Sequence, residues 1–149
     1  MPSWVEGQVT WQMRVRIPLP EQIKFVIMEQ LLLHLFGDFI LQNDSVALRK
    51  KERSWTGLLY CIYHCITYSI PFLLITNWKA CILIGIGHFL IDRWNIVGYF
   101  IKTKNFVKTL ENFGHKPERP FAITAWLYII QDNTIHLIWN FFIIYMFAK

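Results

Sequence analysis

The chain has 149 residues, of which 54% are hydrophobic and 17% aromatic, with seven tryptophans and twelve phenylalanines. This composition argues against a soluble all-α domain, because four apolar helices would leave too little polar surface to cover them. The net charge of +5 is gathered in segments beside apolar blocks, so anionic lipid headgroups explain it better than a nucleic acid does. We therefore expect an integral membrane protein that binds no nucleic acid.

The first segment, residues 1–20, differs from the rest of the chain. Apolar residues alternate with polar ones between Val9 and Ile17, which favours a short extended arm lying on the membrane surface. Pro18 and Pro20 end this arm and suit the first turn of a following helix. We therefore divide the chain into an extended N-terminal arm, 1–20, and a transmembrane domain, 21–149, and we assign no function to the arm.

Four apolar blocks follow the arm. Each reaches the roughly 20 residues that a helix needs to cross a hydrocarbon core of about 30 Å. Helices are expected because polar and apolar residues do not alternate within the blocks, as they would in strands. Lipid also offers no hydrogen-bond partner to unpaired backbone N–H and C=O groups. The predicted fold is an all-α, integral membrane four-helix bundle with an amphipathic cytoplasmic segment, 100–112, before the last helix. The blocks are residues 22–41, 55–75, 78–101 and 121–147.

The basic residues predict the orientation. Four Lys or Arg lie between residues 49 and 53 and five between 102 and 119, all on one side of a four-helix protein, against five on the other side. The positive-inside rule places these two loops in the cytoplasm and both termini outside it. The expected location is the bacterial inner (cytoplasmic) membrane.

Three pairs of ionisable residues interrupt the apolar blocks at a spacing of four. On a helix, each pair lies on one face, one turn apart. The third pair has the reverse order, so a helix antiparallel to the other two would bring the three imidazoles to one membrane level and the three carboxylates to another. His64, in the second block, is expected at the same depth. The pairs are His34 with Asp38, His88 with Asp92, and Asp132 with His136.

Buried ionisable groups are costly unless they are paired, solvated or bound to a metal. Imidazole with carboxylate suits a divalent transition metal, of which zinc fits best and manganese, nickel or iron also fit. A hydrogen-bonded network that only sets the helix register is the alternative. We predict a metal site formed by His34, Asp38, His64, His88, Asp92, Asp132 and His136.

Other residues with reactive side chains are expected to be structural. The three cysteines lie in apolar blocks without metal-type spacing, so they predict neither disulfides nor a zinc knuckle. His115 follows Gly114 in the last loop and is predicted to be a solvated loop histidine.

The strings around the three pairs resemble a known family. They are HLFGDFILQ from His34 to Gln42, HFLIDR from His88 to Arg93, and QDNTIH from Gln131 to His136. They look like the bacterial and phage-encoded membrane proteins called domain of unknown function 3307, over about residues 22–147. Their style is also similar to the YdjM-type inner-membrane proteins, a likeness that implies metal-dependent hydrolysis.

The predicted function is that of an inner-membrane metal-dependent hydrolase. Its partners would be membrane lipids and a small amphiphilic phosphate or ester substrate. The sequence is also compatible with a homo-oligomer. A bound metal would activate water, with Asp38, Asp92 or Asp132 as the general base. The alternative is a non-enzymatic effector, such as a pore, an ion or proton conductor, or a phage-encoded envelope or defence protein. A third alternative is a scaffold that binds a partner through its basic loops.

Overall fold

The computed structural model describes residues 19–147, and these residues form helices joined by loops, with no strand among them. The predicted all-α class is therefore confirmed. The predicted extended arm lies outside the described residues except for its last two, which begin the first helix. The helices are α1 (Leu19–Leu35), α2 (Asp44–Arg49), α3 (Trp55–Ser69), α4 (Trp78–Arg93), α5 (Ile96–Lys104) and α6 (Phe121–Phe147), with the short segments η1 (Phe36–Ile40), η2 (Ile70–Leu74) and η3 (Glu111–Gly114).

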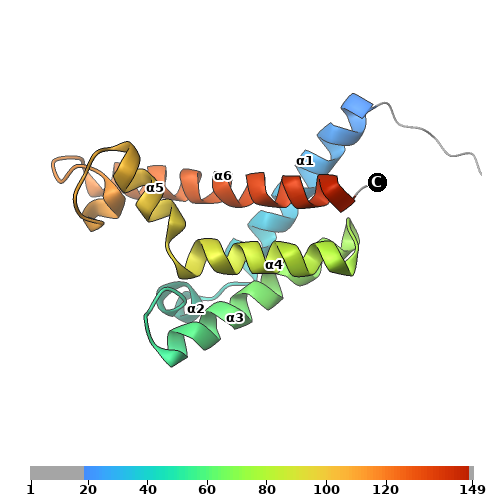
Figure 1. The fold of residues 1–149 in the computed structure, drawn as a ribbon, viewed down its shortest axis with the longest axis horizontal. Helices are drawn as coiled ribbons and strands as arrows, with labels where there is room; N and C mark the ends of the chain where they lie inside the picture. The colour runs from blue at the N-terminus through green and yellow to red at the C-terminus, as the bar shows by residue number, and fades with distance from the viewer. Residues whose placement is uncertain (1–18, 148–149) are drawn as a thin grey trace, which may run out of the picture.

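The four long helices alternate in direction. In Figure 1, α4 and α6 run antiparallel to each other, α3 lies against α4, and α1 crosses behind α6. Helix α6 runs opposite to α1 and α4. This is the antiparallel arrangement that the reversed order of Asp132 and His136 requires. The α2–α3 loop, the α4–α5 junction and the start of α6 all lie at one end of the molecule.

Polar caps and a proline set the helix limits. The side chains of Asn43, Ser54 and Asn77 accept hydrogen bonds from the first-turn amides of α2, α3 and α4, which have no partner within their own helices. Pro71 ends α3, because its ring cannot continue the α-helical ladder, and the chain tightens into the 3₁₀ turn η2.

The third apolar block does not form one helix. It breaks after Arg93, and α5 leaves α4 at a bend of 56°. Asn95, at the break, has a left-handed backbone with φ of 49°, which asparagine tolerates better than most residues. The separate helix α5 overlaps only the start of the segment 100–112, which was predicted to be amphipathic, and ends at Lys104.

The helices differ in how well they meet the criteria for a membrane span. The stretch Trp55–Leu74 has the length and hydropathy to cross a membrane, and α4 with α5 is a second such stretch if the bent pair counts as one. Not all four predicted spans are therefore reproduced. Helix α6 has the length, but polar residues between Gln131 and Asn140 lower its hydropathy.

Two glycines allow the close helix contacts that hold the site. A Cβ on Gly37 would lie 2.5 Å from Cδ2 of Tyr68, and a Cβ on Gly87 would overlap the indole of Trp139. That indole donates a hydrogen bond of 3.0 Å to the carbonyl of Leu83, so α6 is fastened against α4 one turn from His88. Small residues at such positions let helix backbones approach each other closely.

We expect Gly87→Ala to destabilise the protein by about 1–3 kcal/mol, because the added methyl group must displace the Trp139 ring. The measurement is the free energy of unfolding in detergent. Gly85→Ala is the matched control, since the atom nearest to its Cβ would be the Ser69 hydroxyl oxygen, at 3.2 Å. Equal stability losses in the two variants would contradict the close contact.

Candidate metal centre

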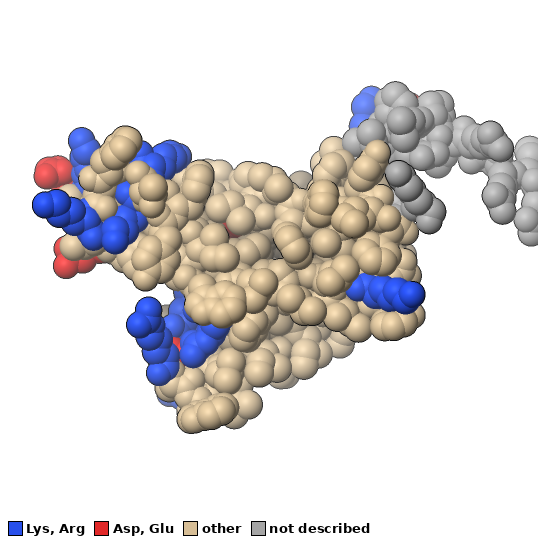
Figure 2. Space-filling model, in the orientation of Figure 1, with Lys and Arg blue, Asp and Glu red and all other residues tan. Residues whose placement is uncertain are grey.

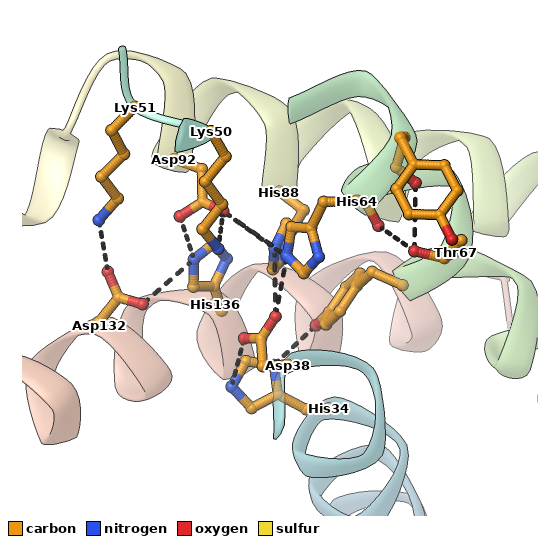
Figure 3. A network of polar contacts seen from close by, with 12 residues as sticks. His34, Asp38, Lys50, Lys51, His64, Thr67, His88, Asp92, Asp132 and His136 are labelled. Carbon is orange, nitrogen blue, oxygen red and sulfur yellow. Dashed lines mark hydrogen bonds and ion pairs between the residues drawn. The ribbon is translucent and has the colours of Figure 1, made fainter. Parts of the chain in front are cut away.

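The seven residues of the predicted site lie in one cluster at the middle of the bundle (Figure 3). Helix α1 with η1 supplies the first pair, α3 supplies His64, α4 the second pair and α6 the third. The four imidazoles and Asp92 are at most 1% exposed. The network that links them is continuous, because each carboxylate lies within 3.7 Å of at least one imidazole nitrogen.

A π-helical turn sets the place of Asp38. Segment η1 closes with an i→i+5 hydrogen bond from the amide of Leu41 to the carbonyl of Phe36. Such wide turns recur at functional sites because they re-aim side chains. Asp38 thus lies among three imidazoles, His34, His64 and His88, rather than in a separate carboxylate layer.

Three ligand atoms converge in the centre of the cluster. Nε2 of His64 lies 2.8 Å from Nε2 of His88, and Oδ1 of Asp38 lies 3.1 Å and 3.4 Å from these two nitrogens. Ligand atoms in tetrahedral zinc sites, with bonds of about 2.0–2.1 Å, are roughly 3.3–3.4 Å apart. The triangle therefore matches one face of a metal coordination polyhedron to within about 0.6 Å, the largest difference being in the edge between the two Nε2 atoms.

The protons of this triangle support the same assignment. A neutral imidazole carries one proton, so two Nε2 atoms in contact share at most one hydrogen bond. Oδ1 of Asp38, at the third corner of the triangle, is buried and has no hydrogen-bond partner among the described residues. A cation among the two Nε2 atoms and the Asp38 carboxylate would use all three electron pairs, so the residues present fit a metal.

A second group overlaps the first. Asp92 places Oδ2 3.3 Å from Nε2 of His88 and Oδ1 3.7 Å from Nε2 of His136. His88 belongs to both groups, and its Nε2 has one lone pair, so it can bind one ion at a time. The imidazoles of His88 and His136 stack with centroids 4.1 Å apart, which keeps both rings in place.

Lys50 enters the cluster from the basic loop. It is 8% exposed, and its Nζ lies 2.6 Å from Oδ2 of Asp92. A buried carboxylate without a cation beside it would destabilise the fold by roughly several kcal/mol. When Asp92 binds no metal, the ion pair with Lys50 is therefore needed. Lys50 was not among the predicted site residues, because its neighbours Arg49 and Lys51 made it part of a basic run.

His34 differs from the other imidazoles. Its Nε2–H donates to Oδ1 of Asn133 at 2.7 Å, and the Tyr68 hydroxyl donates to its Nδ1 at 2.8 Å. The amide of Asn140 in turn donates a hydrogen bond of 2.6 Å to the Tyr68 oxygen. The Tyr68 hydroxyl must then donate to His34, which sets the direction of the whole series of hydrogen bonds. In this arrangement neither ring nitrogen of His34 is free to bind a metal, and its contacts hold Tyr68, whose ring stacks on His88 at 3.7 Å.

Asp132 lies at the edge of the cluster, towards the basic end. Its Oδ2 is 3.7 Å from Nε2 of His136, and its Oδ1 is 4.0 Å from Nζ of Lys51. Lys51 also donates a hydrogen bond of 2.6 Å to the Tyr128 hydroxyl. Burial alone would lower the pKa of Lys51, but Tyr128 and Asp132 raise it above its usual value, so this lysine remains charged.

Some of the unpredicted site residues carried a usable signal. Tyr68 follows His64 by four residues and Asn140 follows His136 by four, so each continues the polar stripe of its helix. Asn133 and Asn140 were visible only as polar residues of the last apolar block. Lys50 had no such signal, because its burial depends on how the loop folds over α4.

The prediction for His115 is wrong. The side chain is 3% exposed and lies in the turn after η3, where the Asn105 amide contacts its Nδ1 at 3.1 Å. Burial, Arg119 and Lys104 lower its pKa below the usual value, so it is neutral at pH 7. The left-handed backbone of Asn112, Phe113 and Gly114 folds the loop inward over it, which no local pattern indicates.

Comparison with known proteins finds one family. A family model described as "Protein of unknown function (DUF3307)" matches residues 26–149. No curated protein and no solved structure matches the chain.

We expect purified protein to carry a divalent transition metal, and His88→Ala to abolish its binding, because this imidazole belongs to both ligand groups. Elemental analysis of protein purified without added chelator is the measurement. His115→Ala is the control, since it removes a buried imidazole outside the cluster. Removal of the metal should also lower the melting temperature in detergent, because it leaves several buried ionisable groups without their cation. Full metal occupancy in His88→Ala would rule out this centre.

We expect Tyr68→Phe to cost about 1–3 kcal/mol of stability, because it leaves the buried Asn140 amide and Nδ1 of His34 without their partner. Metal content should be unchanged, since the hydroxyl is not a ligand in this arrangement. Unfolding in detergent and elemental analysis of the same preparation measure both quantities. Loss of metal with unchanged stability would show that Tyr68 acts at the metal rather than through the His34 chain.

Proposed function

The chain belongs to the family of proteins of unknown function called DUF3307, and we propose that it is an inner-membrane, metal-dependent hydrolase. Its substrate would be a lipid or another amphiphile with a phosphate or carboxylic ester. The observation that carries this proposal is the convergence of Asp38, His64 and His88 within 3.4 Å inside an otherwise apolar bundle.

The surface supports a membrane location. Large apolar side chains are exposed along every long helix, for example Leu32 at 60%, Leu59 at 64% and Ile138 at 64%, while ionisable ones fill the centre. Figure 2 shows an uncharged surface over most of the face in view, with basic groups gathered at the end that carries α2, α5 and η3. Outward apolar and inward ionisable residues are what a bilayer requires.

The charge distribution supports the orientation. Both basic loops lie at the same end of the molecule, as an arrangement with both in the cytoplasm needs. Lys50 and Lys51 link the cluster to that end through their ion pairs with Asp92 and Asp132. A substrate group at the level of the headgroups would therefore approach from the cytoplasmic side.

The ligand set supports zinc and a catalytic site. Structural zinc sites have four protein ligands, whereas catalytic ones have three and keep a position for water or substrate. Asp38, His64 and His88 form such a set of three, and manganese, nickel or iron would accept the same atoms. When bound, the metal would lower the pKa of a water molecule and polarise the scissile group.

The neighbouring groups have distinct roles in this proposal. Asp92 lies beside the triad and is the first choice of general base, held in place by Lys50. His136 lies between Asp92 and Asp132, with Nε2 3.7 Å from one oxygen of each, so it would help to hold the Asp92 carboxylate in place. Asp38 belongs to the ligands and is less suited to this role.

The inner end of the cluster favours a closed site over a conducting path. Beyond Tyr68 and Asn140 the bundle is filled by an apolar core that includes Phe72, Ile84 and Ile143. A pore, or a proton or ion conductor, would need polar groups to continue through this core. The looser likeness to the YdjM-type proteins supports the hydrolase by analogy only.

The test is hydrolysis by zinc-loaded protein in liposomes, measured on a phosphatidylglycerol and a carboxylic ester amphiphile. We expect Asp92→Asn to lower the rate by about 10²–10⁴-fold, the usual contribution of a general base. Asp44→Asn, the same change at an exposed position, should have no effect. Metal-independent ion flux without turnover of either amphiphile would favour the conductor and refute the hydrolase.

A further inference from the structure

A large cavity lies outside the metal cluster, at the junction of α4 and α5. Its volume is about 1120 Å³, which is above the roughly 300–1,000 Å³ of ordinary small-molecule pockets. Lys51, Arg53 and Arg93 line one part of it, and Trp94, Ile96 and Phe100 line another. We propose that this junction groove binds an anionic glycerophospholipid, with the phosphate against the three basic residues and an acyl chain along the apolar ones.

The basic part of the groove is suited to a phosphate. None of the described residues that line it is acidic, so three cations lie together without a counter-ion in the lining. Arg93 donates one guanidinium N–H to the backbone carbonyl of Glu52, which anchors it and leaves other donors free. Guanidinium groups match phosphate oxygens with paired, charge-assisted hydrogen bonds. A bound lipid phosphate would offset one of these charges.

The apolar part of the groove selects a lipid over a free phosphate. Trp94, Ile96 and Phe100 are 59%, 41% and 51% exposed, and Trp94 follows Arg93 directly along the chain. Tryptophan favours the membrane–water interface, where its amphipathic ring meets the headgroups. A phosphate ion would use none of this surface, whereas the first carbons of an acyl chain would cover it.

The bend between the helices makes the groove. Asn95 takes the left-handed backbone that turns α5 by 56° away from α4, and its Oδ1 accepts a hydrogen bond of 3.0 Å from the Tyr128 hydroxyl. A Cβ on Gly98 would lie 2.6 Å from Nδ2 of Asn95, so a glycine is needed to seat this side chain. The groove is therefore held open by specific contacts to α6.

Lys51 joins the groove to the metal cluster. It lines the cavity and lies 4.0 Å from Asp132, while the preceding Lys50 contacts Asp92 at the centre (Figure 3). A lipid bound here would have its ester groups near the entrance to the cluster. The claim that the bound lipid is also the substrate rests on the proposed function. The claim that the groove binds a lipid does not depend on it.

The test is lipid binding by the full chain in neutral detergent, measured by native mass spectrometry with dioleoyl phosphatidylglycerol and dioleoyl phosphatidylcholine. We expect the anionic lipid to bind more tightly, and the double variant Arg53→Gln, Arg93→Gln to lose at least about tenfold in affinity, as for lost charge-assisted hydrogen bonds. The matched control is Lys108→Gln, Lys116→Gln, which removes two exposed charges outside the groove lining. Its affinity should stay within about twofold of the wild type.

Three results would overturn the proposal: equal affinity for the two lipids, equal losses in the two double variants, or glycerol 3-phosphate binding as tightly as the lipid. If the double arginine variant does not fold, the single variant at the exposed Arg53 replaces it, with Lys108→Gln as its control and a loss of about threefold or more expected. Lipid turnover is scored separately. Selective binding without turnover would refute the hydrolase alone, and turnover without selective binding would refute the groove alone.

Discussion

The convergence of Asp38, His64 and His88 inside a shell of apolar helices is the constraint on which the rest of the structure depends. Ionisable groups removed from water are stable only when other groups compensate their charge and their hydrogen-bonding capacity. The protein supplies part of this compensation through Lys50 and through the hydrogen bonds of His34 with Tyr68 and Asn133. The two Nε2 atoms that face each other and Oδ1 of Asp38, which has no hydrogen-bond partner, are what a metal ion would complete.

The backbone has several features that bring these residues together. The π turn η1 aims Asp38 at the centre, and the missing side chains at Gly37 and Gly87 let α3 and α6 close around it. On one side of the cluster an apolar core closes the bundle, and on the other two consecutive lysines lead to the basic end. The cluster thus has charged neighbours on one side only, which suits the proposed hydrolase better than a conducting path.

Much of this arrangement could be predicted from local spacing. The His–Asp pairs four residues apart, and the reversed order of the third, follow from helix periodicity and from an antiparallel α6. The helical class and the close contacts at glycine follow from the same reasoning. The break after Arg93 could not be predicted, because no proline stands at it and the left-handed Asn95 is held there by Tyr128, 33 residues away.

The sequence by itself determined the helices and which helix faces carry the polar side chains, because both depend on residues three or four positions apart. Only the tertiary structure decided the part that each polar side chain takes. His34 is engaged by Tyr68 and Asn133, which lie 34 and 99 residues away, while His64 and His88 keep their Nε2 atoms directed at each other. Which nitrogen is free to bind a metal depends on such distant neighbours, and no spacing along the chain encodes them.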